Sequence, residues 1–312
     1  MVDPLTQVVG LLQPSASFSK LVLAGGAWTV RRDDHSQPFY AAVLDGTCRL
    51  VIDGEAEIVL AAGDFVLIPA ASAFAASSLV APSAGRPPPP VEVGPGVFRL
   101  GPAEVPPDLR MLVGHCTFAS DDTDLLLSFL PRFVHVRGVG RLAMLLGLVN
   151  EETRADRPGR EVVLARLLEV LLIEALRSTT GPTAPSGLLR GLADERVAAA
   201  LRRMHERPTA PWTVAVLARE AGLSRSTFFE RFRREVGVPP MAYLLAWRIA
   251  LAKDLLGREG AGVAEVAERV GYGSASTFST AFARHVGRPP IHYAREQRVQ
   301  PRSPAPLNVG QG

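Results

Sequence analysis

Short runs of apolar residues separated by turn signals occupy residues 39–68 of the chain. The runs are FYAAVL, TCRLVI, EAEIVLAAG and DFVLIP, and Asp-Gly pairs stand at Asp45–Gly46 and Asp53–Gly54. An Asp-Gly pair between apolar runs favours a β-hairpin, because both residues tolerate positive φ. Several short strands at this spacing predict a small antiparallel β-barrel or sandwich, and MLVGHCTF (residues 111–118) is expected to return to it as a further strand.

Proline interrupts this pattern over residues 81–108. The stretch contains nine prolines, and the run Pro87–Pro90 lacks the backbone donors that the interior of a sheet requires. We therefore expect residues 81–108 to form an exposed loop with polyproline character.

The period becomes helical after residue 118. Residues 141–153 and 161–178 are long enough and rich enough in Leu, Ala, Glu and Arg to predict two helices. The second is apolar nearly all round, so we expect it to be buried against the barrel, against its partner helix or against a second subunit. The stretch STTGPTAPSG (178–187) is typical of a linker. These patterns predict a first domain over residues 1–178, a linker over 179–193, a helical domain over 194–298 and a disordered tail over 299–312.

The strongest signal in the chain is an internal repeat. Residues 224–243 align without gaps on residues 274–293, with 11 of 20 positions identical. Each copy reads as a short helix, a turn that contains Gly222 or Gly271, and a second helix. Ser224 and Ser274 are the expected N-caps of the second helices. This pattern predicts two helix-turn-helix units, whose second helices can enter the major groove of DNA.

Helical spacing separates a core face from an outward face in each second helix. Phe228, Phe232 and Val236 lie at i, i+4 and i+8, on a stripe that must face the core. Side chains on the opposite face can bond to base edges or phosphate, so this face is the candidate DNA contact. Its residues are Ser226, Thr227, Glu230, Arg233 and Arg234 in the first copy, and Ser276, Thr277, Thr280, Ala283 and Arg284 in the second.

The two copies share their buried positions and differ in their outward chemistry. Glu230 aligns with Thr280, and Arg233 aligns with Ala283. This difference predicts that the copies read different base sequences. A solvated face is the alternative for each side chain, and Glu230 has the further alternative of pairing with a neighbouring arginine. Ser224 and Ser274, with the exposed amides of their helix starts, are expected to contact phosphate.

Charge favours a polyanionic partner for the second half. The length of 312 residues suits about two domains. Residues 1–190 hold 16 basic and 20 acidic residues, a net of −4, and residues 191–300 hold 17 and 11, a net of +6; Arg302 completes the total of +3. All basic residues except Lys20 and Lys253 are arginine, whose planar fork suits phosphate and guanine.

Other classes of protein fit the chain poorly. Two cysteines, Cys48 and Cys116, exclude a disulfide framework. The N-terminus has no signal-peptide pattern, and the most apolar stretch, residues 162–176, carries charges and is shorter than a bilayer requires. We expect a cytoplasmic protein without a membrane partner.

The tandem units resemble the DNA-binding domain of the AraC/XylS family of transcription regulators. The resemblance covers residues 194–296 and is most specific in GYGSASTFSTAFARHVGRPP, which begins at Gly271. It implies two recognition helices held about one DNA turn apart by a linking helix. That helix is expected over residues 241–256, with Arg248 as a contact to the DNA backbone. The resemblance implies double-stranded promoter DNA and RNA polymerase as partners.

The N-terminal half resembles the cupin-type regulatory domain of the same family. The matching segments are GTCRL (46–50) and GDFVLIP (63–69). Cupin enzymes hold a metal through an HxH motif with further Glu and His ligands. This sequence has no HxH, and Phe74 stands where a histidine is expected. We therefore expect an α+β protein, a cupin-like antiparallel barrel with trailing helices followed by an all-α domain, with no metal, cofactor or enzymatic activity.

The nature of the signal stays open between three readings. One is a small organic effector bound in the barrel, lined by Phe39, Tyr40, Cys48 and His115. Another is oxidation of the thiols of Cys48 and Cys116, if these lie close together and a positive charge lowers the pKa of one of them. In the third, both cysteines are small buried apolar residues.

Two alternatives for the whole chain also remain. One is a metal-dependent cupin enzyme fused to a DNA-binding module, and the other is an architectural DNA protein without a ligand. A homodimer is a further expectation, with the apolar helix over residues 161–178 as its interface.

Overall fold

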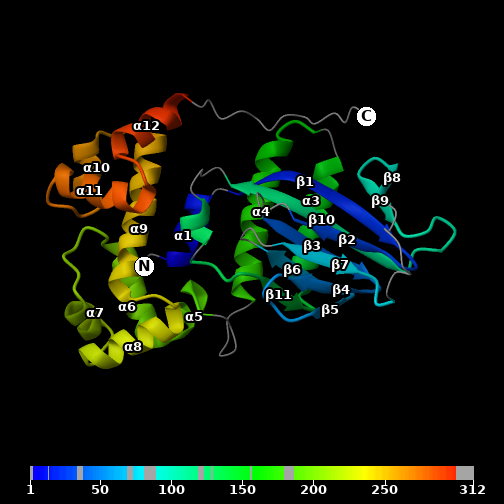
Figure 1. Cartoon of the computed structure of the whole chain (residues 1–312), viewed down its shortest axis with the longest axis horizontal. Helices are drawn as coiled ribbons and strands as arrows, with labels where there is room; N and C mark the ends of the chain where they lie inside the picture. The colour runs from blue at the N-terminus through cyan, green and yellow to red at the C-terminus, as the bar shows by residue number, and fades with distance from the viewer. Residues whose placement is uncertain are drawn as a thin grey trace. The chain divides into compact units, whose positions relative to one another are not determined.

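The computed structural model describes residues 3–12, 14–33, 38–68, 73–80, 89–118, 123–127, 129–154, 157–178 and 186–299. The chain forms two compact units (Figure 1). The barrel unit comprises residues 12–184, and the helical unit comprises residues 185–312 together with residues 1–11. The sequence patterns placed residues 1–11 in the first domain. Of the tail expected to be disordered over residues 299–312, residues 300–312 lie outside the described residues, and Val299 is the last residue of a helix.

Two β-sheets build the barrel unit. The seven-stranded sheet has the order β11-β6-β3-β10-β1-β9-β8, and the four-stranded sheet has the order β2-β7-β4-β5. The strands are β1 (Pro14–Ala24), β2 (Thr29–Arg32), β3 (Phe39–Asp45), β4 (Thr47–Ile52), β5 (Ile58–Ala61), β6 (Asp64–Ile68), β7 (Phe74–Ser77), β8 (Val91–Gly94), β9 (Val97–Leu100), β10 (Leu109–Phe118) and β11 (Val134–Arg137). All paired strands are antiparallel except β1 and β9, which run parallel.

The core of the barrel unit lies between the two sheets. Alternate residues of each strand point into it, so β3 contributes Ala41 and Val43 while β4 contributes Cys48, Leu50 and Ile52. The strands expected over residues 39–68 and 111–118 are confirmed as β3, β4, β5, β6 and β10.

One of the two expected hairpins is wrong. Asp53–Gly54 does connect a paired hairpin, β4 with β5. Asp45–Gly46 instead connects β3, in the larger sheet, to β4, in the smaller sheet. At this corner a Cβ on Gly46 would lie 2.1 Å from the carbonyl oxygen of Asp108, which precedes β10. The glycine is therefore needed for a crossing between sheets, a use that local sequence does not distinguish from a hairpin.

Replacing Gly46 by alanine should destabilise the barrel unit more than the same change at Gly96. Both residues have positive φ, at +81° and +67°. A Cβ at Gly96 has nothing within 4 Å, so Gly96→Ala reports the backbone cost alone, about 1–2 kcal/mol. Gly46→Ala adds a clash with backbone. Thermal unfolding followed by circular dichroism measures the difference, and equal losses would show that the Asp108 backbone gives way freely.

The proline-rich stretch is only partly a loop. Residues 81–88, including Pro87 and Pro88, lie outside the described residues, but β8 and β9 occupy residues 91–100. The expectation of a loop over all of 81–108 is therefore wrong. Each of these strands is a proline-free run of four residues, and both lie at the edge of the larger sheet, where flanking prolines are tolerated.

The expected trailing helices are α3 (Gly140–Arg154) and α4 (Arg160–Arg177), preceded by the short α2 (Thr123–Leu127). Both long helices pack against each other and against β1 (Figure 1). One face of α4, including Leu164, Leu168 and Leu172, is buried, and Val162, Val163 and Val170 on the same helix are exposed. Core packing thus accounts for only part of the apolar surface of α4.

The helical unit contains α1 (Pro4–Leu12), α5 (Leu188–Ala193), α6 (Glu195–Glu206), α7 (Val214–Glu220), α8 (Arg225–Val236), α9 (Pro240–Asp254), α10 (Val263–Arg269), α11 (Ala275–Val286) and α12 (Pro290–Val299). A π-helical turn, Leu255–Glu259, extends α9. No helix of the described residues is long and apolar enough to cross a membrane.

A buried histidine connects α1 to this unit. The Oε1 atom of Gln7 lies 2.9 Å from Nδ1 of His205, and the Tyr243 hydroxyl lies 2.7 Å from Nε2. Because an amide oxygen only accepts, Nδ1 donates to Gln7 and Nε2 accepts from Tyr243. The imidazole also stacks on Trp247, with ring centroids 4.0 Å apart. His205 therefore joins α1, α6 and α9.

Candidate nucleic-acid interface and sensor site

The second helix of each unit, α8 and α11, begins at the expected cap. Ser224 Oγ accepts from the amide of Thr227 and Ser274 Oγ accepts from the amide of Thr277, each at 3.2 Å. Gly237 and Gly287 end the helices with φ of +87° and +80°. Local chemistry therefore sets the bounds of both recognition helices.

The core face of both helices is as expected. Phe228 and Phe232 on α8, and Phe278 and Phe282 on α11, are fully buried. Their rings contact one another at 5.6 Å and 5.5 Å between centroids. The two copies thus share one aromatic scaffold.

The outward residues of both helices are exposed. These are Ser226, Thr227, Glu230, Arg233 and Arg234 on α8, and Ser276, Thr277, Thr280 and Arg284 on α11; the capping Ser224 and Ser274 are exposed as well. Ala283, the remaining outward position, is half-buried. The exposure that helical spacing predicted is present, and the contacts of these residues with DNA stay a prediction.

The hydroxyl groups on these faces are already oriented by the helices. Thr227 Oγ1 lies 2.8 Å from Ser224 Oγ, and Thr277 Oγ1 lies 2.9 Å from Ser274 Oγ. Thr280 Oγ1 donates to the carbonyl oxygen of Ser276 at 3.1 Å. The Thr280 hydroxyl therefore presents its lone pairs outward and suits a donor on a base, such as an amino group.

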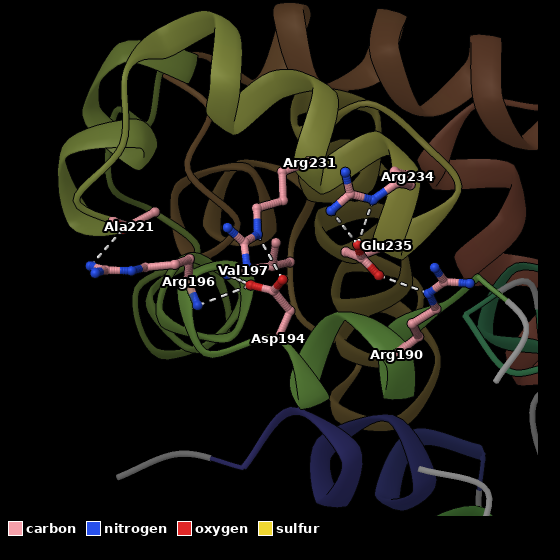
Figure 2. A network of polar contacts seen from close by, with 8 residues as sticks. All are labelled: Arg190, Asp194, Arg196, Val197, Ala221, Arg231, Arg234 and Glu235. Carbon is pink, nitrogen blue, oxygen red and sulfur yellow. Dashed lines mark hydrogen bonds and ion pairs between the residues drawn. The ribbon is translucent and has the colours of Figure 1, made fainter. Parts of the chain in front are cut away.

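The charged residues of α8 and α11 divide into two sets, and Figure 2 shows the paired set, which lies on α8. Arg231 donates to Asp194 at 2.7 Å, and Arg234 donates to Glu235 at the same distance. Within the described residues, the side chains of Glu230, Arg233 and Arg284 make no hydrogen bond or ion pair. These three charges are therefore available to an external partner.

Two carboxylates fix α8 to the helices before it (Figure 2). Burial alone would raise the pKa of Glu235, but its bonds with Arg190 and Arg234 outweigh that effect and lower it. The pKa of Asp194 is also lowered, because the amides of Val197 and Arg196 and the Arg231 side chain together outweigh burial. Both carboxylates stay ionised and tie α8 to α5 and α6.

Two arginines lie differently from the sequence expectation. Arg248, on α9, donates from Nε to the carbonyl oxygen of Pro208 at 2.8 Å and from Nη2 to that of Ala210 at 2.9 Å. Its guanidinium thus has partners inside the unit, and its contact with the DNA backbone stays a prediction. Arg225, the first residue of α8, is an exposed cation that the spacing argument left out. Its replacement by Ala275 in the second copy is the signal that would have identified it.

The structure brings together only part of the expected effector site. The rings of Phe39 and His115 are 5.5 Å apart, and Phe74 lies 4.5 Å from Phe39. Arg32 joins them, with Nη1 2.5 Å from His115 Nδ1. Sequence reasoning missed Arg32, which the two-residue period of β2 places on the same face as Val30, a partly buried residue that packs against the core.

Tyr40 and Cys48 do not belong to this cluster. Tyr40 follows Phe39 on β3, so its side chain lies on the opposite face of the sheet. Cys48 lies in the core with Sγ 3.6 Å from Sδ of Met111. Met111 precedes His115 by four residues on β10, which places Cys48 about 13 Å along the strand from the cluster.

The same register separates the two cysteines. Cys116 pairs through its backbone with Ala16, five residues along β10 from Met111. At about 3.3 Å per residue, its position is about 16 Å along the strand from the residue that Cys48 contacts. Burial, with a smaller contribution from Asp64, raises the pKa of the Cys48 thiol to about 12. The condition for an interacting thiol pair is therefore not met at Cys48.

Known protein families match both the barrel unit and the helical unit of the chain. A family model described as "Cupin" matches residues 3–181, and one described as "Helix-turn-helix domain" matches residues 217–296. A protein of Streptomyces lividans named as an AraC-like transcription regulator is 36% identical over 287 residues, which cover 88% of this chain and 91% of that protein. The chain belongs to the AraC-like transcription regulators.

Other relatives of this AraC-like regulator are more distant. The regulator MtrA of Neisseria gonorrhoeae is 26% identical over 279 residues, 88% of this chain and 91% of MtrA. The solved DNA-binding domain of AdpA in complex with a target DNA is 31% identical and is covered completely by 35% of this chain, with a TM-score of 0.34. A structure of ToxT from Vibrio cholerae is 14% identical, with coverage of 90% and 94% and a TM-score of 0.37.

Proposed function

We propose that this AraC-like regulator binds promoter DNA in a sequence-specific manner through α8 and α11 and responds to a signal in its cupin-like barrel. The observation that carries the proposal is the pair of capped, exposed helix faces on one shared aromatic scaffold. Glu230 and Arg233 on one face, against Thr280 on the other, suit different bases. Transcription is then controlled by occupancy of a promoter site and contact with RNA polymerase.

Phosphate binding supplies much of the affinity in this proposal. The exposed helix starts at Ser224 and Ser274 offer amides and a partial positive charge to phosphate. Arg225, Arg233 and Arg284 add unpaired cations on the same faces. Affinity is therefore expected to fall steeply with salt concentration.

Selection of binding sites from a random duplex pool tests the proposal. Full-length protein should enrich one bipartite sequence with two half-sites about one helical turn apart. Fluorescence anisotropy should then show at least about 10³-fold preference over random duplex at matched salt. Enrichment of no sequence, with equal affinity for all duplexes, would instead support an architectural DNA protein.

Replacing Thr280 by valine should relax the base preference at one position of the half-site read by α11. Valine keeps the shape of the side chain but removes the outward acceptor, which is worth about 1–3 kcal/mol of discrimination. Anisotropy with all four base pairs at each position of the selected site measures the change. Arg202→Gln, an exposed change on α6, is the matched control and should leave the preferences unchanged.

For the signal, we propose a small organic molecule at the cluster of Arg32, Phe39, Phe74 and His115. The guanidinium offers donors to a polar or anionic group, and the aromatic rings offer an apolar surface. A thermal-shift screen of small organic acids tests this assignment. Ligands that stabilise the wild type should lose their effect in Arg32→Gln, and an undiminished shift would place the site elsewhere.

The Cys48 thiol should not react in the native protein. Its raised pKa of about 12 leaves almost no thiolate at neutral pH. Titration with a chromogenic disulfide should therefore give the same number of fast-reacting thiols in wild type and in Cys48→Ser. Loss of one fast-reacting thiol in that variant would restore the thiol-oxidation reading.

The oligomeric state of the protein is a further proposal. We propose a homodimer through the exposed valines of α4 together with Met144 and Leu148 of α3. Val163→Glu should then shift the sedimentation coefficient to that of a monomer.

Among the described residues, no group of three or more His, Cys, Asp or Glu side chains is placed to hold a metal ion. Stoichiometric Fe, Mn, Ni or Zn in the purified protein would favour the alternative of a cupin enzyme. Because it acts on promoter DNA, we propose that the protein works in the cytoplasm and is not an enzyme.

A further inference from the structure

The turn of the second helix-turn-helix unit packs directly on the segment that precedes the first. Gly271, in that turn, has φ of +85°. A Cβ on this residue would lie 2.7 Å from Cα of Thr209 and 3.0 Å from the carbonyl oxygen of Pro208. Residues 208 and 209 lead into α7, whose N-cap is Thr213. The backbone of the second helix-turn-helix unit therefore touches the backbone that leads into the first helix-turn-helix unit.

Arg248 holds this contact together. From the linking helix α9, its guanidinium donates to Pro208 at 2.8 Å and to Ala210 at 2.9 Å. The same guanidinium lies 5.9 Å from the ring centroid of Tyr272, the residue after Gly271. A Cβ on Gly271 would also lie 2.9 Å from Nη2 of Arg248. One side chain thus touches the linking helix, the entry to the first unit and the turn of the second.

Both partners of Arg248 are themselves anchored. The segment at 207–212 is closed by a bond from the Ala210 amide to the Arg207 carbonyl at 3.1 Å. The indole of Trp212 also donates to that carbonyl, at 2.8 Å. On the other side, the ring of Tyr272 packs edge-on against Phe278 of α11, with centroids 5.5 Å apart. A displacement at Arg248 therefore reaches the recognition helix through rigid contacts.

The duplicated turn of the first unit lacks this arrangement. Gly222 also has positive φ, +63°. A Cβ there would meet the end of the Arg196 side chain at 2.8 Å, and no backbone of the other unit within 4 Å. The two turns are alike in sequence, but of their two glycines only Gly271 lies against backbone of the other helix-turn-helix unit among the described residues.

We propose that Arg248 is a positioning residue that sets the distance and orientation between α8 and α11, so that both helices reach their half-sites in register. The inference rests on the proposed function as a sequence-specific regulator. Binding of the second half-site is intramolecular once the first is bound, so its effective concentration depends on how firmly the units are held. Two guanidinium donors satisfied by carbonyl oxygens do this without neutralising a phosphate.

Three properties distinguish a positioning role of Arg248 from a contact of Arg248 with phosphate. Loss of a positioning residue weakens binding to the complete site and relaxes the preference for the native spacing of half-sites. It leaves the slope of log K against log salt unchanged, whereas loss of a phosphate contact reduces that slope by about one. Lysine restores a phosphate contact but cannot serve two carbonyls with the fork geometry of arginine.

The test uses full-length protein and the duplex selected by the wild type. Arg248→Gln and Arg248→Lys are compared on that duplex, on a version with one half-site randomised, and on a version with one base pair inserted between the half-sites. Both variants should lose about tenfold or more on the native duplex, keep their affinity for the half-randomised duplex, and discriminate less against the insertion. A reduced salt slope with rescue by lysine, or an unchanged spacing preference, would overturn the inference.

A second measurement does not depend on DNA or on Arg248 substitutions folding well. Gly271→Ala should broaden the distance between spin labels at Ser226→Cys and Ser276→Cys, in a background with Cys48→Ser and Cys116→Ser. Gly222→Ala, which carries the same backbone strain, should leave the distance distribution narrow. Equal distance distributions in the two variants would reject the positioning contact between Gly271, Arg248 and residues 208–210, whereas failure of the wild type to select any duplex would reject only the proposed function.

Discussion

Phe232→Ala should destabilise the helical unit by about 3–5 kcal/mol and abolish DNA binding at 37 °C. The Phe232 ring is fully buried between Phe228, at 5.6 Å, and Tyr243, at 5.9 Å between centroids. Removal of the ring leaves a cavity between α8 and α9 that cannot close without moving α8. A loss of this size is a large share of the 5–15 kcal/mol that is typical of a folded domain. Denaturant unfolding of the full chain, followed by tryptophan fluorescence, measures it.

Phe229→Ala is the matched control for this change. Phe229 is the same residue type on the same helix, but it is only partly buried, and the second copy has Ser279 at that position. Its removal should cost less than half as much. Comparable losses at the two positions would contradict the assignment of the core stripe of α8.

Acid should destabilise the helical unit through His205. Burial lowers the pKa of this imidazole to about 3, from an ordinary value of 6.5. Below pH 6.5 the unfolded chain binds a proton that the folded chain does not, so stability falls as the pH decreases from 6.5 towards 3. The slope contributed by this one residue approaches about 1.4 kcal/mol per pH unit. Protonation would also place a second donor opposite the Tyr243 hydroxyl, which now donates to Nε2.

The contribution of His205 is isolated by comparing slopes rather than absolute stabilities. Free energies of unfolding between pH 4 and 7 should fall less steeply in His205→Gln than in the wild type, because glutamine does not titrate. His285→Gln, an exposed change on α11, should keep the wild-type slope. Identical slopes in all three proteins would show that other groups account for the acid sensitivity.

The helix-turn-helix units were predictable because their signals are local. The caps Ser224 and Ser274, the aromatic stripe of α8 and the glycine ends all act within a few residues along one helix. Comparison of the two copies then separated the shared buried positions from the outward positions that differ. The N-cap at Asp3, followed by Pro4, is a similar local signal for α1, although no helix was predicted there from the sequence.

The barrel shows where local signals stop. The same Asp-Gly pair joins paired strands at Gly54 and crosses between sheets at Gly46. The difference depends on Asp108, more than sixty residues further along the chain. Similarly, alternation along β3 separates Tyr40 from Phe39, but only the packing of the two sheets brings Arg32 of β2 to His115 of β10.

By itself, the sequence determined the two recognition helices, their buried and exposed faces, the resemblance to AraC/XylS regulators and five strands of the barrel unit, β3 to β6 and β10. Tertiary structure alone decided that α1 packs in the helical unit, through Gln7 and His205, which are 198 residues apart. It also decided that Cys48 is a buried thiol beside Met111. The hydrogen bonds of Arg248 to backbone carbonyl oxygens within the helical unit were likewise decided by the tertiary structure. The physical reason is the same in each case: caps and periodicity act between near neighbours, whereas burial, pKa and the partners of a long side chain depend on residues that only folding brings together.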